Sequence, residues 1–272
     1  MLKYTEGDQI INGVKIHYYR TGGKKPPIIL LHGATDNGLC WSPLAEWLSV
    51  KYDVIMPDAQ GHGHSDRLNT TLKSADPAGQ IATLAQQLNL IKPIIMGHSM
   101  GAGTTTNIAV NYPDLPKAII LEDPAWIEVI DPSKMTPEMK KEHAERTQAL
   151  AGFAKMSREE VLAYGRKFNP TWSEAELLPW SEAKTQFDPN LFKNMLLTGP
   201  GYRELAPKIN CPTLLIISDG GLVKPETAMQ AAKLWKSKYP FRWVQIKGAG
   251  HNIRREQFEK FKETVGQFLE SL

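Results

Sequence analysis

The sequence contains few cysteines and no long apolar run. Only Cys40 and Cys211 occur among the 272 residues, and they are far apart in the chain. A disulfide-stabilised scaffold is therefore not expected, and two buried free thiols are. No apolar run approaches the ~20 residues that span a membrane, and residues 1–8 lack the apolar core of a signal peptide. We expect a cytoplasmic protein with no membrane partner.

An excess of charge of one sign is also lacking. The net charge is +3, and the basic residues are scattered apart from short pairs such as Lys24-Lys25 and Arg254-Arg255. Nucleic-acid binding needs a concentrated basic face, so nucleic acid is not an expected partner. The hydrophobic and charged contents, 42% and 22%, are those of an ordinary globular domain.

Short apolar segments recur along the chain and indicate β-strands. Residues 9–19 predict a β-hairpin, because Asn12-Gly13 separates two alternating segments. Several later runs are continuous, which is typical of strands covered on both faces. The later apolar runs, continuous or not, lie at residues 28–31, 54–56, 94–96, 118–121, 213–217 and 241–246.

Helical patterns alternate with the strands. The segment from Asp76 to Leu90 has a capping aspartate, Pro77 in its first turn and apolar residues at helical spacing. The alternation predicts an α/β fold with a parallel sheet and helices on both of its faces. Further helices are expected at residues 41–48, 99–112, 226–238 and 258–268.

The alternation stops between residues 127 and 206. This stretch contains helical segments at residues 135–155 and 158–168 but no convincing strand. Insertions on such scaffolds lie where ligand loops emerge, so a helical cap over the active site is expected after the sixth core strand. The core then comprises residues 1–126 and 207–272, and the cap residues 127–206.

The segment Gly97-His98-Ser99-Met100-Gly101 joins an apolar strand directly to a helix. A serine on so tight a turn holds its hydroxyl clear of the backbone, and the helix N-terminus behind it favours negative charge. Glycines flank the turn because a Cβ there would clash. An ordinary turn with a capping serine has the same five residues, so the context must decide. It favours Ser99 as a nucleophile.

A base and two oxyanion donors accompany this serine. His251 stands in a glycine-rich loop after the last strand, from which it reaches the same end of the sheet. The loop after residues 28–31 reads His32-Gly33-Ala34. The N–H groups of Ala34 and Met100 are expected to stabilise a developing oxyanion.

Four motifs together resemble the successive signatures of the α/β-hydrolase superfamily. They are His32-Gly33, Asp-Ala-Gln-Gly-His-Gly-His-Ser at residues 58–65, the pentapeptide around Ser99, and Gly-Ala-Gly-His at residues 248–251. The resemblance implies the α/β-hydrolase fold, with a mostly parallel eight-stranded sheet and a helical cap. It also implies a catalytic triad of serine, acid and histidine. It is nearly silent on the substrate.

The acid of that triad has three candidates. In most of the family it follows the seventh strand, where Asp219 stands one place out of the usual register. A minority of relatives place it at the end of the sixth strand, where Glu122 and Asp123 lie. Glu122 follows Ser99 by 23 residues, close to the spacing of that minority. Glu122 is therefore preferred, followed by Asp219 and then Asp123.

The identity of the nucleophile narrows the reaction. Dehalogenases and epoxide hydrolases of this fold need aspartate at position 99, whereas serine implies an acyl-enzyme. The expected activity is a carboxylesterase or lactonase for a small-to-medium apolar substrate, with Gly33 and Trp126 beside the substrate. No cofactor or metal is expected, and the protein is expected to be a monomer or homodimer. The alternatives are a lyase of the hydroxynitrile-lyase type, which uses the triad as a base, and a non-hydrolysing ligand receptor.

Overall fold

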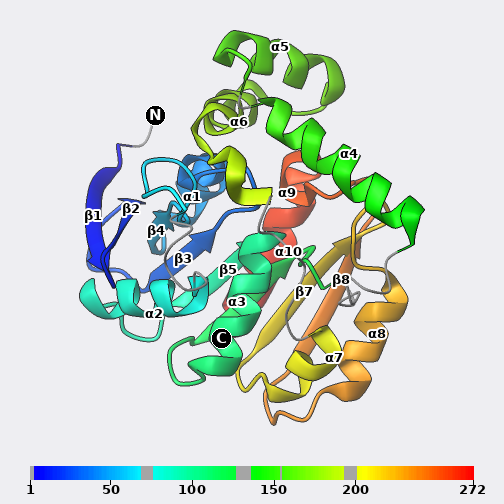
Figure 1. Cartoon of the computed structure of the whole chain (residues 1–272). Coiled ribbons are helices and arrows are strands. Elements are labelled where there is room, and N and C mark those ends of the chain that lie inside the picture. Colours follow the sequence, from blue (N-terminus) through cyan, green and yellow to red (C-terminus); the bar gives the residue numbers. More distant parts are fainter. Residues whose placement is uncertain (1–2, 69–75, 127–135, 154, 193–200) are drawn as a thin grey trace.

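The computed structural model describes residues 3–68, 76–126, 136–153, 155–192 and 201–272. Within these residues eight strands form one sheet in the order β1-β2-β4-β3-β5-β6-β7-β8 (Figure 1). Strand β2 pairs antiparallel with β1 and β4, and the other pairings are parallel. The expected α/β-hydrolase sheet is thus confirmed. The strands are β1 (Thr5–Ile11), β2 (Val14–Arg20), β3 (Pro27–Leu31), β4 (Asp53–Pro57), β5 (Ile94–His98), β6 (Ala118–Glu122), β7 (Thr213–Ser218) and β8 (Phe241–Ile246).

The first two strands form the expected hairpin. Asn12 and Gly13 connect them with φ angles of 51° and 81°. Two successive left-handed residues form the turn whose twist matches that of the flanking strands, and Asn-Gly is the preferred sequence for it. The hairpin is longer than the predicted residues 9–19, because β1 begins at Thr5.

Helices cover both faces of the sheet (Figure 1). One face packs against α1 and α10, and the other against α2, α3 and α8. The helices of the core are α1 (Ser42–Leu48), α2 (Pro77–Gln87), α3 (Met100–Asn111), α7 (Tyr202–Leu205), α8 (Pro225–Leu234), α9 (Ile253–Glu256) and α10 (Phe258–Glu270), with short 3-10 turns η1 (Gly38–Trp41) and η4 (Ala206–Lys208).

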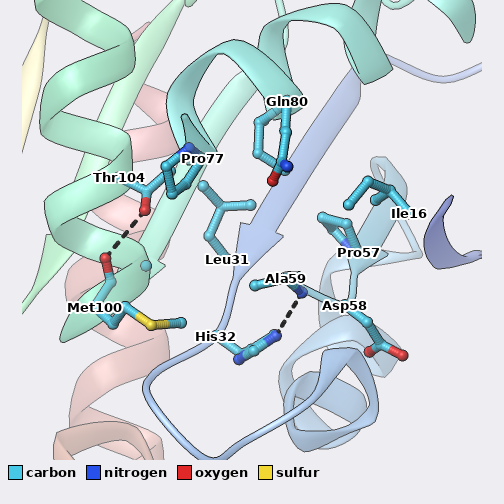
Figure 2. A pocket seen from close by; sticks show the side chains of 12 residues that line it. Ile16, Leu31, His32, Pro57, Asp58, Ala59, Pro77, Gln80, Met100 and Thr104 are labelled. Carbon is cyan, nitrogen blue, oxygen red and sulfur yellow. Dashed lines mark hydrogen bonds between the residues drawn. The ribbon is translucent and has the colours of Figure 1, made fainter. Parts of the chain in front are cut away.

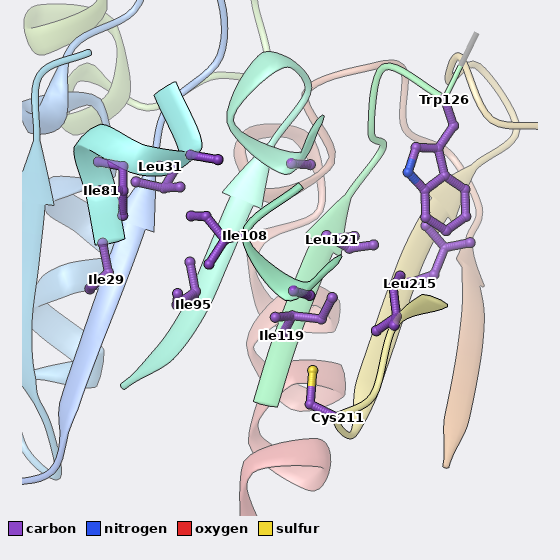
Figure 3. Close-up of a cluster of buried hydrophobic side chains, with 14 of the residues drawn as sticks. Ile29, Leu31, Ile81, Ile95, Ile108, Ile119, Leu121, Trp126, Cys211 and Leu215 are labelled. Carbon is purple, nitrogen blue, oxygen red and sulfur yellow. The ribbon is translucent and has the colours of Figure 1, made fainter. Parts of the chain in front are cut away.

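Strands β3 to β7 are buried almost throughout, which explains their continuous apolar runs. Figure 3 shows one of the two apolar layers, in which Ile29, Ile95 and Ile119 of adjacent strands pack against Ile81 and Ile108 of the helices. Parallel strands covered on both faces have no polar side. Cys40 and Cys211 are both buried and free, as expected.

Among the described residues, three helices of more than ten residues precede α7 between β6 and β7, in the stretch where a cap is predicted. They are α4 (Pro137–Phe153), α5 (Arg158–Phe168) and α6 (Glu174–Gln186), followed by η3 (Pro189–Phe192). We call α4–α6 the inserted helices. They lie together at one end of the molecule (Figure 1), and Trp172 and Trp180 form a small core with Cys40. The predicted boundary at residue 127 and helix start at Met135 fall outside the described residues.

No helix among the described residues is both long and apolar enough to cross a membrane.

Candidate active site

Ser99 lies at the tight turn between β5 and α3. Its φ of 52° and ψ of −111° place it in a strained region of backbone space. The turn is possible because Gly97 and Gly101 allow close approach: a Cβ on Gly101 would overlap the Leu31 carbonyl, and one on Gly97 the Gly101 carbonyl. The Ser99 N–H donates to the Glu122 carbonyl at 3.0 Å. The backbone therefore presents this side chain at the carboxyl end of the sheet.

Asp123 is the carboxylate that binds His251. The Nδ1–H of His251 donates to Asp123 Oδ2 at 2.5 Å, and Asp123 is fully buried. The backbone N–H groups of Leu222 and Val223 donate to the same carboxylate at 2.8 and 2.9 Å. The loop after β7 thus binds Asp123, which follows β6, and does not itself supply the carboxylate that contacts His251.

Glu122, the preferred acid, has a different partner. Its carboxylate accepts the Arg254 N–H at 2.9 Å and the Arg254 guanidinium at 3.0 Å, and both side chains are fully buried. Burial raises the pKa of Glu122, against the opposing charge of Arg254. The expectation that Glu122 orients His251 is corrected: Glu122 is the last residue of β6, whereas Asp123 follows the strand with a left-handed φ of 39° and is the residue that contacts His251.

Asp219 also lies away from the His251 ring. Its carboxylate accepts the backbone N–H groups of Gly248 and Ala249 at 3.0 and 3.3 Å. These hydrogen bonds lower the pKa of Asp219. Asp219 therefore braces the loop that carries His251, and its expected role as the acid is corrected too.

Residues 32–37, called the oxyanion loop below for their expected role, are held by hydrogen bonds of His32 and His62. The Nδ1–H of His32 donates to the Gly33 carbonyl at 2.8 Å, and Nε2 of His62 accepts the Thr35 N–H at 3.2 Å. Burial lowers the pKa of His32 and lowers that of His62 to about 3. Both rings are neutral near pH 7, and each accepts one backbone N–H: His62 Nε2 that of Thr35, and His32 Nε2 that of Ala59.

These contacts orient the expected oxyanion donor. The Gly33 carbonyl accepts hydrogen bonds from the His32 ring and from the Asp36 N–H. The N–H of Ala34 belongs to the same peptide unit and points the opposite way. Within the described part of the chain, the N–H groups of Ala34 and Met100 donate no hydrogen bond.

Gly33 lies directly beside the nucleophile turn. A Cβ on Gly33 would be 3.5 Å from Ser99 Cβ and 2.7 Å from His98 Nδ1. His98 in turn donates through Nε2 to the His251 carbonyl at 3.0 Å, and the two rings lie 4.7 Å apart. Burial and the neighbouring His251 hold the pKa of His98 well below its usual value. The structure thus brings the Ser99, His251 and Gly33 segments together.

A small cavity of about 30 Å³ borders the oxyanion loop (Figure 2). Figure 2 shows the Met100 side chain and the His32 ring at its edge, with His32 accepting the Ala59 N–H. The lining is mostly apolar, which suits a small apolar group rather than an ion. A larger cavity, about 430 Å³, lies at the amino ends of the strands beside Lys92 and Pro212, away from Ser99.

Trp126 is placed in the core. It is 6% exposed, its indole N–H donates to Thr106 Oγ1 at 3.1 Å, and its ring stacks on Tyr202. These contacts satisfy both its apolar surface and its polar atom. Trp126 therefore packs in the core, and its expected contact with substrate stays a prediction.

A buried charge cluster beside the site was not predicted. Asp36, Glu176, Lys184 and Arg255 are each about 5% exposed or less, and they form ion pairs with one another. One sequence signal was available: Glu176, Trp180 and Lys184 are spaced four residues apart and therefore share one helix face. The partners Asp36 and Arg255 had no such signal.

No group of three or more His, Cys, Asp or Glu side chains in the described ranges is arranged to hold a metal ion.

A family model for the alpha/beta hydrolase fold matches residues 26–254. An uncharacterized protein of Mycobacterium tuberculosis is 34% identical over 103 residues, which are 38% of this chain and 30% of that protein. The N-formylmaleamate deformylase of Pseudomonas putida is 27% identical over 271 residues, 97% of this chain and 96% of the deformylase.

A similar fold is found among solved structures. The enol-lactonase of Burkholderia xenovorans has a TM-score of 0.74 and 22% identity, and covers 97% of this chain and 100% of its own. At this level of identity the similarity establishes the fold.

Proposed function

Because the chain belongs to the alpha/beta hydrolase fold family, we propose that it is a serine hydrolase that cleaves a carboxylic ester or lactone through an acyl-enzyme on Ser99. The observation that carries the proposal is the Asp123–His251 hydrogen bond at the end of the sheet that also presents Ser99. A serine becomes nucleophilic when an oriented histidine takes its proton. In this proposal the inserted helices belong to the predicted cap, and the Lys184 side chain of α6 contacts the loop after β3 beside the site.

In the proposed acylation step, Ser99 Oγ forms a bond to the carbonyl carbon while its proton passes to Nε2 of His251. The carbonyl oxygen becomes an oxyanion, which accepts hydrogen bonds from the N–H groups of Ala34 and Met100. As the tetrahedral intermediate collapses, the bond to the leaving group breaks and His251 returns the proton to the leaving oxygen. Asp123 stabilises the His251 imidazolium throughout.

Deacylation repeats the same chemistry with water. His251 takes a proton from water, the hydroxide adds to the acyl carbon, and Ser99 leaves with the proton that His251 gives back. The product is a carboxylic acid, and the chain's own residues supply every proton transfer in this sequence.

A second candidate is hydrolysis of an N-acyl bond. The supporting observation is that the deformylase of Pseudomonas putida aligns over 97% of this chain. The step differs only in the leaving atom, since His251 then protonates nitrogen. A panel that pairs each ester with the corresponding N-formyl or N-acetyl compound separates the two activities by their kcat/KM ratio.

The test is labelling and turnover. A fluorophosphonate probe is expected to modify Ser99 and to abolish hydrolysis of p-nitrophenyl esters, and rapid-quench mass spectrometry is expected to detect an acylated Ser99. The Ser99→Ala variant should lose both reactions, while Ser49→Ala, a serine at the end of α1, should keep them. Ester turnover that persists in Ser99→Ala would overturn the proposal, and ligand binding without turnover would favour a receptor.

A further inference from the structure

Lys184 of helix α6 reaches across to the oxyanion loop. Its Nζ donates to Asp36 Oδ1 at 2.7 Å and to the Thr35 carbonyl at 3.1 Å. The side chains of Lys184 and Asp36 are only 5% and 4% exposed. An ammonium group of the inserted helices therefore donates two hydrogen bonds to a loop of the core.

The loop at this point is held in an unfavourable backbone conformation. Thr35 has a φ of 64°, in the left-handed region that β-branched residues rarely adopt. Such a residue persists only when its surroundings hold it there. His62 holds the Thr35 N–H, and Lys184 holds the Thr35 carbonyl. Thr35 directly follows Ala34, whose N–H is the expected oxyanion donor.

Asp36 extends the connection to the segment of His251. Its second oxygen accepts a hydrogen bond from the Arg255 guanidinium at 2.9 Å. Arg255 also donates to Asn252 Oδ1 at 3.0 Å, next to His251 in the chain. The oxyanion loop and the base are thus joined through one carboxylate.

The cluster is balanced in charge. Arg255 also pairs with Glu176 of α6 at 3.2 Å, so two cations face two carboxylates. Burial would raise the pKa of Asp36, but Arg255 and Lys184 hold it well below its usual value. The Lys184 ammonium lies 4.9 Å from the ring centre of Trp180. A buried ion pair adds little net stability compared with apolar residues of the same size, so we attribute to this cluster a role in fixing the geometry of the loop.

We propose that Lys184 is a positioning residue for the oxyanion hole, so that the inserted helices take part in setting the Ala34 donor. The inference rests on the proposed function. Oxyanion donors act only when they lie where the charge develops, and a shift of ~1 Å can cost about 100-fold in rate. Lys184 touches no reacting atom and acts through the Thr35 carbonyl and Asp36.

The experiment compares Lys184→Met with the wild type in hydrolysis of p-nitrophenyl butyrate. We expect kcat to fall roughly 10- to 100-fold with KM within about 3-fold, because the loss is confined to the transition state. Inhibition by a phenyl trifluoromethyl ketone, which forms a tetrahedral adduct with the serine, should weaken in proportion to the loss in kcat/KM. Lys184→Arg should restore most of the kcat and most of the affinity for the ketone.

The matched control is Lys208→Met, which removes an exposed lysine that pairs with Glu204 at 2.9 Å. It should behave as the wild type. Circular dichroism establishes whether each variant folds; if Lys184→Met does not, Lys184→Gln is compared with Lys184→Arg by the same measurements. A folded Lys184→Met or Lys184→Gln with wild-type kcat and ketone affinity overturns the inference alone. A wild type that neither hydrolyses esters nor reacts with fluorophosphonate overturns the proposed function and the inference with it.

Discussion

Asp123 Oδ2 lies 2.5 Å from Nδ1 of His251, a contact between residues 128 positions apart in the chain. The Leu222 and Val223 N–H groups hold the same carboxylate. The end of β6 and the loops after β7 and β8 therefore converge on one buried acid. This arrangement determines which carboxylate is able to orient the base.

The Asp123→Asn variant tests that assignment. The amide cannot stabilise the His251 imidazolium and favours the wrong tautomer, so kcat is expected to fall by ~10⁴ with the fold intact. Steady-state hydrolysis of p-nitrophenyl butyrate measures the loss. Asp219→Asn is the matched change at the neighbouring loop and should cost less than about 3-fold. A larger loss in Asp219→Asn than in Asp123→Asn would reverse the assignment.

The Glu122→Gln variant should affect stability more than chemistry. It leaves the buried Arg254 guanidinium without its counter-charge, which typically costs ~3–5 kcal/mol. Urea unfolding measures the change in free energy of unfolding, and kcat of the folded variant should stay within a few-fold of wild type. Glu204→Gln breaks an exposed pair with Lys208 and should cost less than about 1 kcal/mol. Normal stability with lost activity would contradict the structural role of Glu122.

The crowding at the turn of Ser99 predicts that alanine substitution of two glycines of α3 has opposite effects on stability. Gly101→Ala should prevent stable folding, because the new Cβ would overlap the Leu31 carbonyl, which is backbone and cannot rotate away. Gly103→Ala, two residues later, meets nothing within 4 Å and should stabilise the helix by up to ~1 kcal/mol. Thermal unfolding distinguishes the two. Equal melting temperatures would show that the turn is less crowded than described.

The neutral His62 predicts a pH dependence of stability. Burial lowers the pKa of His62 from an ordinary 6.5 to about 3, so between these values the unfolded chain binds a proton that the native protein does not. Acid therefore favours unfolding, by ~1.4 kcal/mol per pH unit for this residue. His62→Gln does not titrate, so its free energy of unfolding should decline less steeply between pH 6 and 4.

Urea unfolding at several pH values tests this difference in slope. Above pH 8 neither chain titrates at position 62, so the two stability curves should run parallel there. Parallel curves throughout the acid range would contradict a neutral, buried His62.

Local patterns predicted much of the architecture. The Asn12-Gly13 turn, the continuous runs of the buried strands and the helix at residues 158–168 follow from rules that act over a few residues. The segment around Ser99 was recognisable for the same reason, since its glycines are required by the turn itself. The buried partners Asp36, Lys184 and Arg255 were missed, because ion pairs between distant segments leave no local pattern.

The amino-acid sequence by itself determined the sheet, the turn that carries Ser99, and the loops that carry His251 and Ala34. Only the tertiary structure decided between Glu122 and Asp123. These adjacent residues differ little in sequence terms, but Glu122 ends β6 whereas Asp123 follows it with a left-handed φ of 39°. Packing of α9 places Arg254 against one carboxylate, and the loop of His251 closes over the other. The choice depends on contacts more than 100 residues apart, which no local pattern encodes.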